Sequence, residues 1–198
     1  MSYLVSIGLL VLVAGWALSV YNRLRYMREQ VAEAWAHWLK ATRQRNAYVE
    51  DFAAAVSLVL PPGDMLPRSL RKLAQDSRLA LAQATAGRHD SSSLRASHAE
   101  RELRRVLRRF EPTLESLAAQ PSNEHLQFLG TQVNLLLFHQ NQYARVFNRL
   151  AADYNTALQD VSGRILAPVF GFDEASMLEQ EKTANSPVTA PRGPSDPR

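Results

Sequence analysis

Apolar residues follow two patterns along most of this chain: an unbroken run at the start, and stripes at helical spacing after it. In residues 22–60 the larger apolar side chains recur three and four positions apart. This spacing places them on one face of an α-helix. No Gly or Pro occurs between Val20 and Pro61, so the sequence predicts one helix that continues directly from the initial run.

Similar stripes predict two helices of intermediate length. The second helix is expected over about residues 67–86, after the turn at Pro61, Pro62 and Gly63, with Asp64 or Ser69 as its N-cap. The third carries apolar residues from 94 to 117. Pro112 lies inside that pattern and is expected to kink or divide the helix.

The fourth predicted helix is the longest of the later ones. Its apolar stripe extends from Leu126 to Ile165, and Ser122 precedes it as a plausible N-cap. No stretch alternates with the period of a strand. The predicted fold is therefore all-α: an N-terminal transmembrane helix followed by an antiparallel, elongated four-helix bundle. The shorter second and third helices are expected to cover only its distal half.

Two polar residues interrupt the apolar stripes. Arg45 occupies a stripe position of the first helix, and we expect its guanidinium to reach the edge of the helix, with a buried polar partner as the alternative. Gln140 occupies a stripe position of the fourth helix. It would either fix the register of the packed helices or reach solvent.

The initial run is long enough to cross a bilayer. Residues 4–20 contain no charged side chain, and at 1.5 Å per residue they span roughly 26 Å, against a hydrocarbon core of about 30 Å. Tyr3 and Tyr21 flank the run, where amphipathic rings favour the two membrane interfaces. The predicted lipid-facing residues include Leu4, Leu9, Leu10, Leu12, Trp16, Leu18 and Val20.

The run is also compatible with two other kinds of segment. A cleaved signal peptide normally begins with basic residues, and none precedes Arg23, although Ala17 and Ser19 fit a cleavage site. A buried core helix is disfavoured because the run is apolar on all faces. Basic residues follow the run and none precedes it, which predicts a cytoplasmic body with the N-terminus outside; the opposite orientation is the alternative.

The composition divides the chain into three segments. Residues 1–21 are predicted to be the anchor, 22–172 the helical body, and 173–198 a Pro-rich tail expected to be disordered. The apolar end of the body, from Ile165 to Phe172, is expected to return to the bilayer side, where it would pack on the first helix or contact lipid. Small residues in the anchor (Gly8, Ala14, Gly15, Ala17) would allow two copies to pair closely.

No residue pattern indicates catalysis, a cofactor or a metal. The chain has no cysteine, which rules out disulfides and thiolate chemistry. It has no Gly-x-Ser-x-Gly elbow and no glycine-rich phosphate loop. His98 and Glu102 share a helix face, but no third ligand completes a convincing set. The sequence therefore predicts a protein that is not an enzyme.

The strongest local bias is basic. Residues 68–109 contain eleven Lys or Arg against four Asp or Glu, a net charge of +7, whereas the whole chain carries only +4. Most of this excess is a cluster on the third predicted helix: Arg101, Arg104, Arg105, Arg108 and Arg109. It would be a solvated face or a dock for an acidic protein partner. Nucleic acid is disfavoured, because residues 68–109 contain no Phe, Tyr or Trp for base stacking.

Three motifs occur in a characteristic order. The first follows the anchor and comprises Tyr21, Asn22, Leu24, Arg28, Val31, Ala34 and Trp35. The second is a pair of aromatic-Asn dipeptides seven residues apart, Phe147-Asn148 and Tyr154-Asn155. The third consists of Ala167, Phe170, Gly171 and Phe172. Together they resemble the LemA family, although residues 47–53 lack that family's Asp-Leu-Ile-Pro-Asn-Leu-Val run, so the chain resembles a divergent member.

The resemblance implies a bacterial, membrane-anchored helical bundle without an established biochemical activity. With the missing catalytic groups, it favours an interaction or scaffold module attached to the lipid bilayer and bound to protein partners. The alternative is an accessory or regulatory subunit of a membrane enzyme or envelope complex.

Overall fold

The computed structural model describes residues 2–84, 91–118 and 123–178, and within these ranges the chain forms five helices and no strand. In chain order they are α1 (Ser2–Val59), α2 (Met65–Gln83), α3 (Ser91–Ala118), α4 (Glu124–Gln159) and α5 (Val161–Phe170). The prediction of an all-helical chain is confirmed for this part of the sequence. Ser122, the expected N-cap of the fourth helix, lies outside the described residues.

α1 is a single helix of 58 residues that includes both the apolar run and the first amphipathic stripe. It ends at Val59, before Pro61 and Pro62, which have no backbone N–H to continue the helical hydrogen bonds. Asp64 then caps α2, because its carboxylate accepts a hydrogen bond from the Leu66 N–H at 2.8 Å. Of the two predicted caps, Asp64 is the one used.

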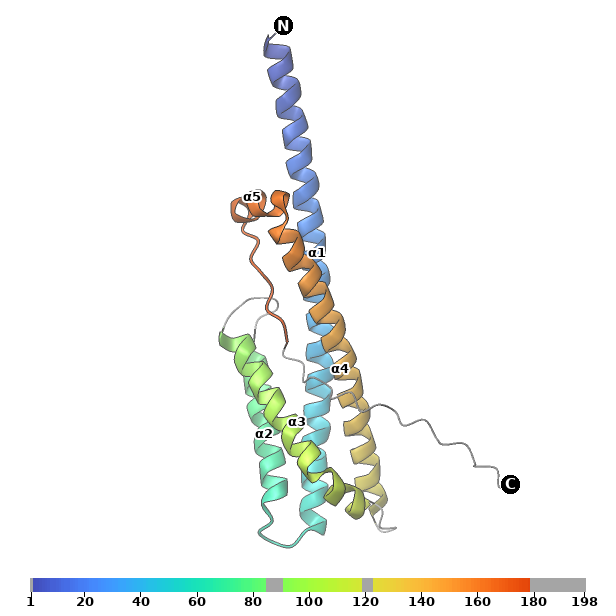
Figure 1. Ribbon diagram of the computed structural model, residues 1–198. Coiled ribbons are helices and arrows are strands. Elements are labelled where there is room, and N and C mark those ends of the chain that lie inside the picture. The colour runs from blue at the N-terminus through green and yellow to red at the C-terminus, as the bar shows by residue number, and fades with distance from the viewer. Residues whose placement is uncertain (1, 85–90, 119–122, 179–198) are drawn as a thin grey trace, which may run out of the picture.

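α4 packs antiparallel along α1 (Figure 1). The rings of Trp35 on α1 and Phe147 on α4 lie 5.4 Å apart. Nearer the apolar run, the ring of Tyr21 lies 5.0 Å from that of Phe170, which ends α5. α2 and α3 pack against each other beside the half of α1 that is farther from the N-terminus, as the helix lengths predicted.

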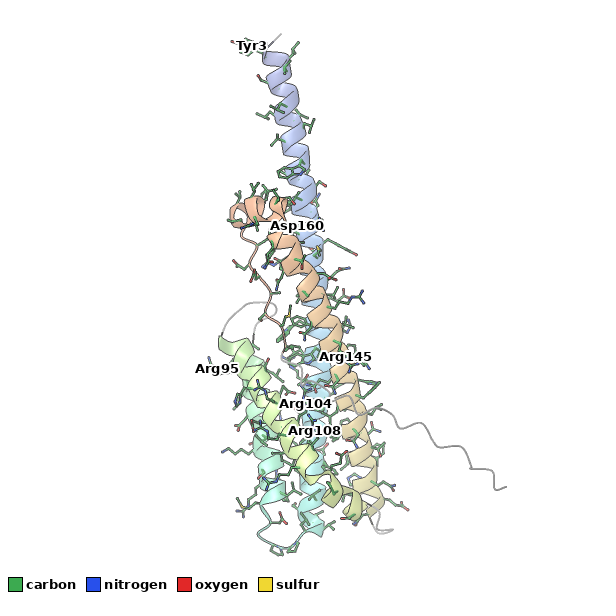
Figure 2. All side chains as sticks on the ribbon, viewed as in Figure 1. Tyr3, Arg95, Arg104, Arg108, Arg145 and Asp160 are labelled. Carbon is green, nitrogen blue, oxygen red and sulfur yellow. The ribbon has the colours of Figure 1, made fainter. Side chains whose placement is uncertain are left out.

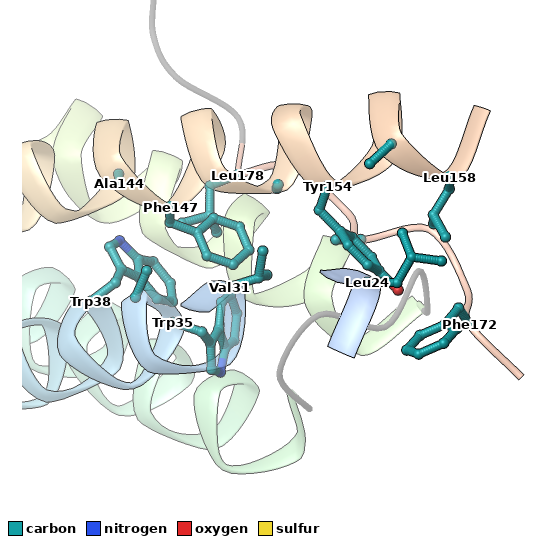
Figure 3. Close-up of a cluster of buried hydrophobic side chains, with 14 of the residues drawn as sticks. Leu24, Val31, Trp35, Trp38, Ala144, Phe147, Tyr154, Leu158, Phe172 and Leu178 are labelled. Atoms are coloured by element: carbon teal, nitrogen blue, oxygen red, sulfur yellow. The ribbon is translucent and has the colours of Figure 1, made fainter. Parts of the chain in front are cut away.

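Two apolar clusters make up the core. The cluster nearer the N-terminus is drawn in Figure 3, where Trp35 and Trp38 of α1 lie against Phe147 of α4, and Leu24 lies against Tyr154. The second cluster lies toward the Pro61 turn and draws its residues from all of α1–α4: Val49, Phe52, Ala53, Val56, Leu66, Leu70, Ala74, Leu103, Leu107, Leu126, Leu129 and Val133.

Two expected helix boundaries differ from the structure. α3 continues as one helix through Pro112, so Pro112 does not divide it, although the last turns of α3 swing toward α4 (Figure 1). The predicted fourth helix does not run to Ile165 but ends at Gln159, since Asp160 leaves the helical conformation at φ −57° and ψ 153°. α5 begins directly after it in a new direction.

Gly163 explains how α5 can turn so tightly onto the end of α4. A Cβ at this position would overlap the carbonyl oxygen of Ala157 and lie 2.7 Å from that of Leu158. Only a residue without a side chain fits there, because those atoms belong to the backbone and cannot rotate away.

Gly163→Ala should therefore displace α5 and lower the free energy of unfolding by about 1–3 kcal/mol, the usual range for overpacking. Gly130→Ala on α4 is the matched control: its Cβ would meet the Phe52 ring at an ordinary 3.6 Å, and alanine raises helix propensity by up to about 1 kcal/mol. Denaturant unfolding of the full chain in detergent micelles measures both. Equal effects of the two substitutions would contradict this account of the turn.

An extended segment after α5 runs back along α4. Gly171 takes a left-handed conformation (φ 67°, ψ 40°) that ends α5, and Phe172, Ala175 and Leu178 are then buried. We call residues 172–178 the return segment. The composition predicts that residues 173–178 belong to a disordered tail, yet they pack on the helical body. Residues 179–198 lie outside the described residues.

The side chains of two α4 asparagines hold the return segment. Asn148 donates to the Leu178 carbonyl and accepts from the Leu178 N–H, both at 2.8 Å. Asn155 makes the same pair of bonds with Ala175, also at 2.8 Å. Each asparagine side chain thus makes the pair of hydrogen bonds that the backbone of a neighbouring β-strand would otherwise make with the return segment.

Candidate functional site

A layer of buried polar side chains separates the two apolar clusters. We call it the polar layer; it consists of Thr42, Arg45 and Asn46 from α1, Ser77 from α2, Glu100 from α3 and Gln140 from α4. Every one of these residues is at most 1% exposed. On each helix the layer falls between a residue of one apolar cluster and a residue of the other, so it crosses the whole core at one level.

A bidentate ion pair forms the centre of the polar layer. Nη1 of Arg45 lies 2.6 Å from Oε2 of Glu100, and Nη2 lies 2.8 Å from Oε1. The planar guanidinium fork matches the two carboxylate oxygens, which is the strongest geometry for such a pair. The pair joins α1 to α3, which are 55 residues apart at these positions.

The remaining donors of Arg45 are also satisfied. Nη1 donates to Oε1 of Gln140 at 2.7 Å, while Nε and Nη2 both donate to Oδ1 of Asn46. The guanidinium therefore uses all five of its N–H groups, with partners from three helices. These hydrogen bonds offset the desolvation penalty that makes buried arginines rare.

Glu100 is satisfied in the same way. Besides Arg45, its carboxylate accepts hydrogen bonds from the Ser77 hydroxyl and from Nε2 of Gln140 at 2.6 Å. Gln140 also donates to the Thr42 hydroxyl at 3.1 Å, and Asn46 donates to Ser77 at 2.7 Å. The network therefore contacts all of α1–α4.

The net electrostatic effect favours the ionised carboxylate. Burial by itself would raise the pKa of Glu100, but the charge of Arg45 and the hydrogen bonds from Arg45, Ser77 and Gln140 outweigh it, so the pKa of Glu100 lies below its usual value. The Glu100 carboxylate is thus ionised at neutral pH and faces the Arg45 guanidinium. A mismatch in register between two helices would leave one charge buried without its partner, so the pair disfavours such a mismatch.

The polar layer corrects one expectation and decides another. Arg45 was expected to extend its guanidinium to the helix edge, but it is fully buried, because Glu100 offers a partner that the first helix alone does not reveal. For Gln140, the sequence leaves open whether the side chain fixes the register of the helices or reaches solvent. The side chain is buried, and both its amide oxygen and its amide nitrogen are hydrogen-bonded. The sequence pattern does not distinguish Glu100 from the surface charges around it.

The predicted arginine cluster lies mainly on the solvent side of α3. Arg101, Arg105, Arg108 and Arg109 are exposed, and Arg105 pairs with Glu102 at 2.7 Å. This is a surface ion pair, which contributes about 0–1 kcal/mol. The four exposed arginines face outward from the same helix whose opposite side carries Leu103 and Glu100 into the core.

Arg104 differs from the other four arginines. It is half-buried and donates to Oδ1 of Asn141 on α4 at 2.7 Å, so it joins α3 to α4 (Figure 2). Burial lowers the pKa of Arg104, with the neighbouring charges of Arg45 and Arg108 acting in the same direction. Arg104 is therefore a packing residue, and the exposed cluster consists of four arginines rather than five.

The remaining candidates are the possible metal ligand His98 and the residues of the predicted membrane span. His98 is exposed, and no group of three His, Asp or Glu side chains suited to a metal ion occurs in the described part of the chain. The large apolar side chains from Tyr3 to Leu18 are all exposed. α1 is long and apolar enough to cross a membrane near its N-terminus, and no part of its most apolar 18-residue stretch is buried inside the protein.

Comparison with known proteins gives no family assignment: no family model matches the chain, and no curated protein matches it.

Proposed function

We propose that this chain is a non-enzymatic interaction module held to a membrane by the first part of α1. The observation that carries the proposal is the continuity of α1. The same helix contains an exposed apolar run and, from Leu24 onward, the residues that pack the core. A partner bound to the helical body is thus connected to the anchor by an unbroken helix rather than by a flexible linker. The basic residues after the run favour a cytoplasmic body.

We also propose that the helices form an antiparallel four-helix bundle of the LemA type, as a divergent member. The contacts between α1 and α4, the pairing of α2 with α3, and the polar layer shared by all of α1–α4 support this arrangement. The two aromatic-Asn pairs add support, because the aromatic residue has one role in both pairs and the asparagine has another. Phe147 and Tyr154 point into the core, while Asn148 and Asn155 bind the return segment.

The interaction surface that we propose is the outer face of α3. Four exposed arginines on two to three turns produce a positive field that suits an acidic protein surface. Arg104 holds this part of α3 against α4, so the arginines are presented on a supported helix.

Reversing Arg101, Arg105, Arg108 and Arg109 to Glu should reduce recovery of the partner at least about tenfold, because like charges across an interface cost several kcal/mol. The measurement is quantitative photo-crosslinking in native membranes, with a crosslinker placed at an exposed residue of α3 such as His98. Full recovery by the reversed variant would refute the arginine surface.

A second reversed variant controls for the total change in charge. Lys40, Arg43, Arg145 and Arg149 are also exposed, but they lie on α1 and α4. Their reversal should leave recovery unchanged. Both variants should remain in the membrane pellet after high-salt and alkaline washes, and a wild-type chain recovered in the soluble fraction would refute the anchor.

A further inference from the structure

α5 is apolar on both of its sides. Its inner side, with Gly163, Leu166 and Ala167, is buried against the helical body. Its outer side carries Val161, Ile165 and Val169, which are 78%, 58% and 72% exposed. These residues recur every four positions and therefore form one stripe, which we call the outer stripe. Surface helices usually present polar residues on that side, so the outer stripe requires an apolar cover.

The position of α5 indicates what that cover is. Phe170, at the end of α5, lies 5.0 Å from Tyr21, and Tyr21 ends the apolar run of α1. Leu24 is the first residue of α1 that is buried in the core. α5 therefore packs against α1 at the point where the bare apolar run joins the helical body (Figure 1).

The direction of the outer stripe follows from the contacts of α5. Its buried side contacts the end of α4, which extends from this point away from the N-terminus, and α1, which passes this point in both directions (Figure 1). The outer stripe is on the opposite side and so faces away from the body. The exposed apolar surfaces of α1 and α5 are therefore adjacent and both lack protein contacts among the described residues.

We propose that α5 lies in the interface of the same lipid bilayer that the N-terminal run of α1 crosses, with its outer stripe at the boundary of the acyl chains. This inference rests on the proposed membrane anchor. Ten residues are too few to span a bilayer. An interfacial helix, however, needs only to bury its apolar side about 5–10 Å below the headgroups.

A bilayer fits these observations better than a protein partner. A second copy or a soluble protein seated on the outer stripe would leave the adjacent apolar run of α1 uncovered, whereas one bilayer covers both. Arg164 is exposed beside the stripe, and its long side chain would carry the guanidinium out to the headgroups. α5 would then fix the depth and tilt of the body relative to the membrane.

Single cysteines test this placement directly, because the chain contains none. Leu12→Cys, Ile165→Cys, Val169→Cys and Leu58→Cys, each in the full chain, are labelled with a bimane fluorophore and reconstituted in phosphatidylcholine vesicles. All four positions are exposed, so the substitutions remove no core packing, and circular dichroism verifies the fold. Phosphatidylcholine with a spin label either on its upper acyl chain or near the chain end is then added as a quencher.

The labels at Ile165 and Val169 should lose about half of their emission with the upper-chain spin label, because an interfacial helix is within contact distance of that part of the acyl chain. The label at Leu12, in the middle of the apolar run, should lose as much with the spin label near the chain end. The label at Leu58, which is 88% exposed at the far end of α1, should keep its emission. Quenching at Leu12 without quenching at Ile165 and Val169 would overturn the placement of α5 and leave the anchor intact. Absence of quenching at Leu12 would overturn both.

Discussion

Glu100→Gln should lower the free energy of unfolding by about 3–5 kcal/mol, the range for breaking a buried ion pair from one side. The substitution keeps the size of the side chain but leaves the Arg45 guanidinium charged and buried, with a neutral amide in place of the carboxylate. Domains of this size are stable by only about 5–15 kcal/mol. Denaturant titration of the full chain in detergent micelles, followed by circular dichroism, measures the loss.

Two further variants identify the cause of that loss. Glu102→Gln lies two residues away on the same helix, but its partner Arg105 is exposed, and it should cost less than about 1 kcal/mol. The double variant Arg45→Met with Glu100→Gln removes the buried positive charge as well, and it should be more stable than Glu100→Gln alone. A double variant less stable than the single one would contradict the importance of the unpaired charge.

The same carboxylate predicts how stability depends on pH. The pKa of Glu100 is lower in the folded chain than in the unfolded chain, where it is about 4.3. Its stabilising contribution is therefore complete above that pH. As the pH falls below it, the unfolded state binds the proton first, and the contribution decreases until the pH has passed through the folded pKa. Glu100→Gln should remove this part of the acid sensitivity and leave the rest.

The polar layer also illustrates what the sequence reveals and what it conceals. Arg45 and Gln140 each interrupt an apolar stripe, and both interruptions were visible in the pattern. Glu100 is an interruption as well, because Ala96, Leu103 and Leu107 continue the stripe on either side of it. Several other charged residues surround it, so Glu100 looks like a member of a solvated face. Three polar interruptions on three helices, with one opposite pair of charges, are the signal that would have indicated a buried network.

Some helix boundaries can likewise be predicted from the sequence, and one cannot. The end of α1 and the cap of α2 follow from local chemistry, since proline lacks a donor and Asp64 supplies an acceptor. The break at Asp160 does not, because residues 126–165 keep one stripe through it. It depends on the tertiary position of α5, which requires Gly163 to contact the end of α4. An isolated glycine in a helical pattern is the only local sign of such a contact.

The return segment could not be expected from composition. Residues 173–178 contain acidic and small residues and no periodic stripe, so they resemble the start of a disordered tail. Their order comes from α4 instead. Asn148 and Asn155 are seven residues apart, about 10.5 Å along a helix; Ala175 and Leu178 are three residues apart, about 10 Å along an extended chain. The two spacings agree, so both asparagines can bind the segment at once.

Replacing both Asn148 and Asn155 by Ala should release the return segment from α4. Each asparagine satisfies one N–H and one carbonyl of the segment, and loss of a partly buried partner costs about 1–3 kcal/mol per site. The amide hydrogens of Ala175 and Leu178 report the effect directly, because they are the donors to the two side chains. Their exchange with solvent should become about 10 to 100 times faster, as such energies imply for local opening.

The rest of the molecule should respond far less. Phe147 and Tyr154 keep their places in the core, so amides of α4 near these residues should retain their protection. Asn134→Ala is the matched control: it removes the same side chain from an exposed position on the same helix and should leave exchange at Ala175 and Leu178 unchanged. If both amides stay protected in the double variant, burial of Phe172, Ala175 and Leu178 alone holds the segment. In that case the asparagines would only align it, and their matched spacing would carry little of its stability.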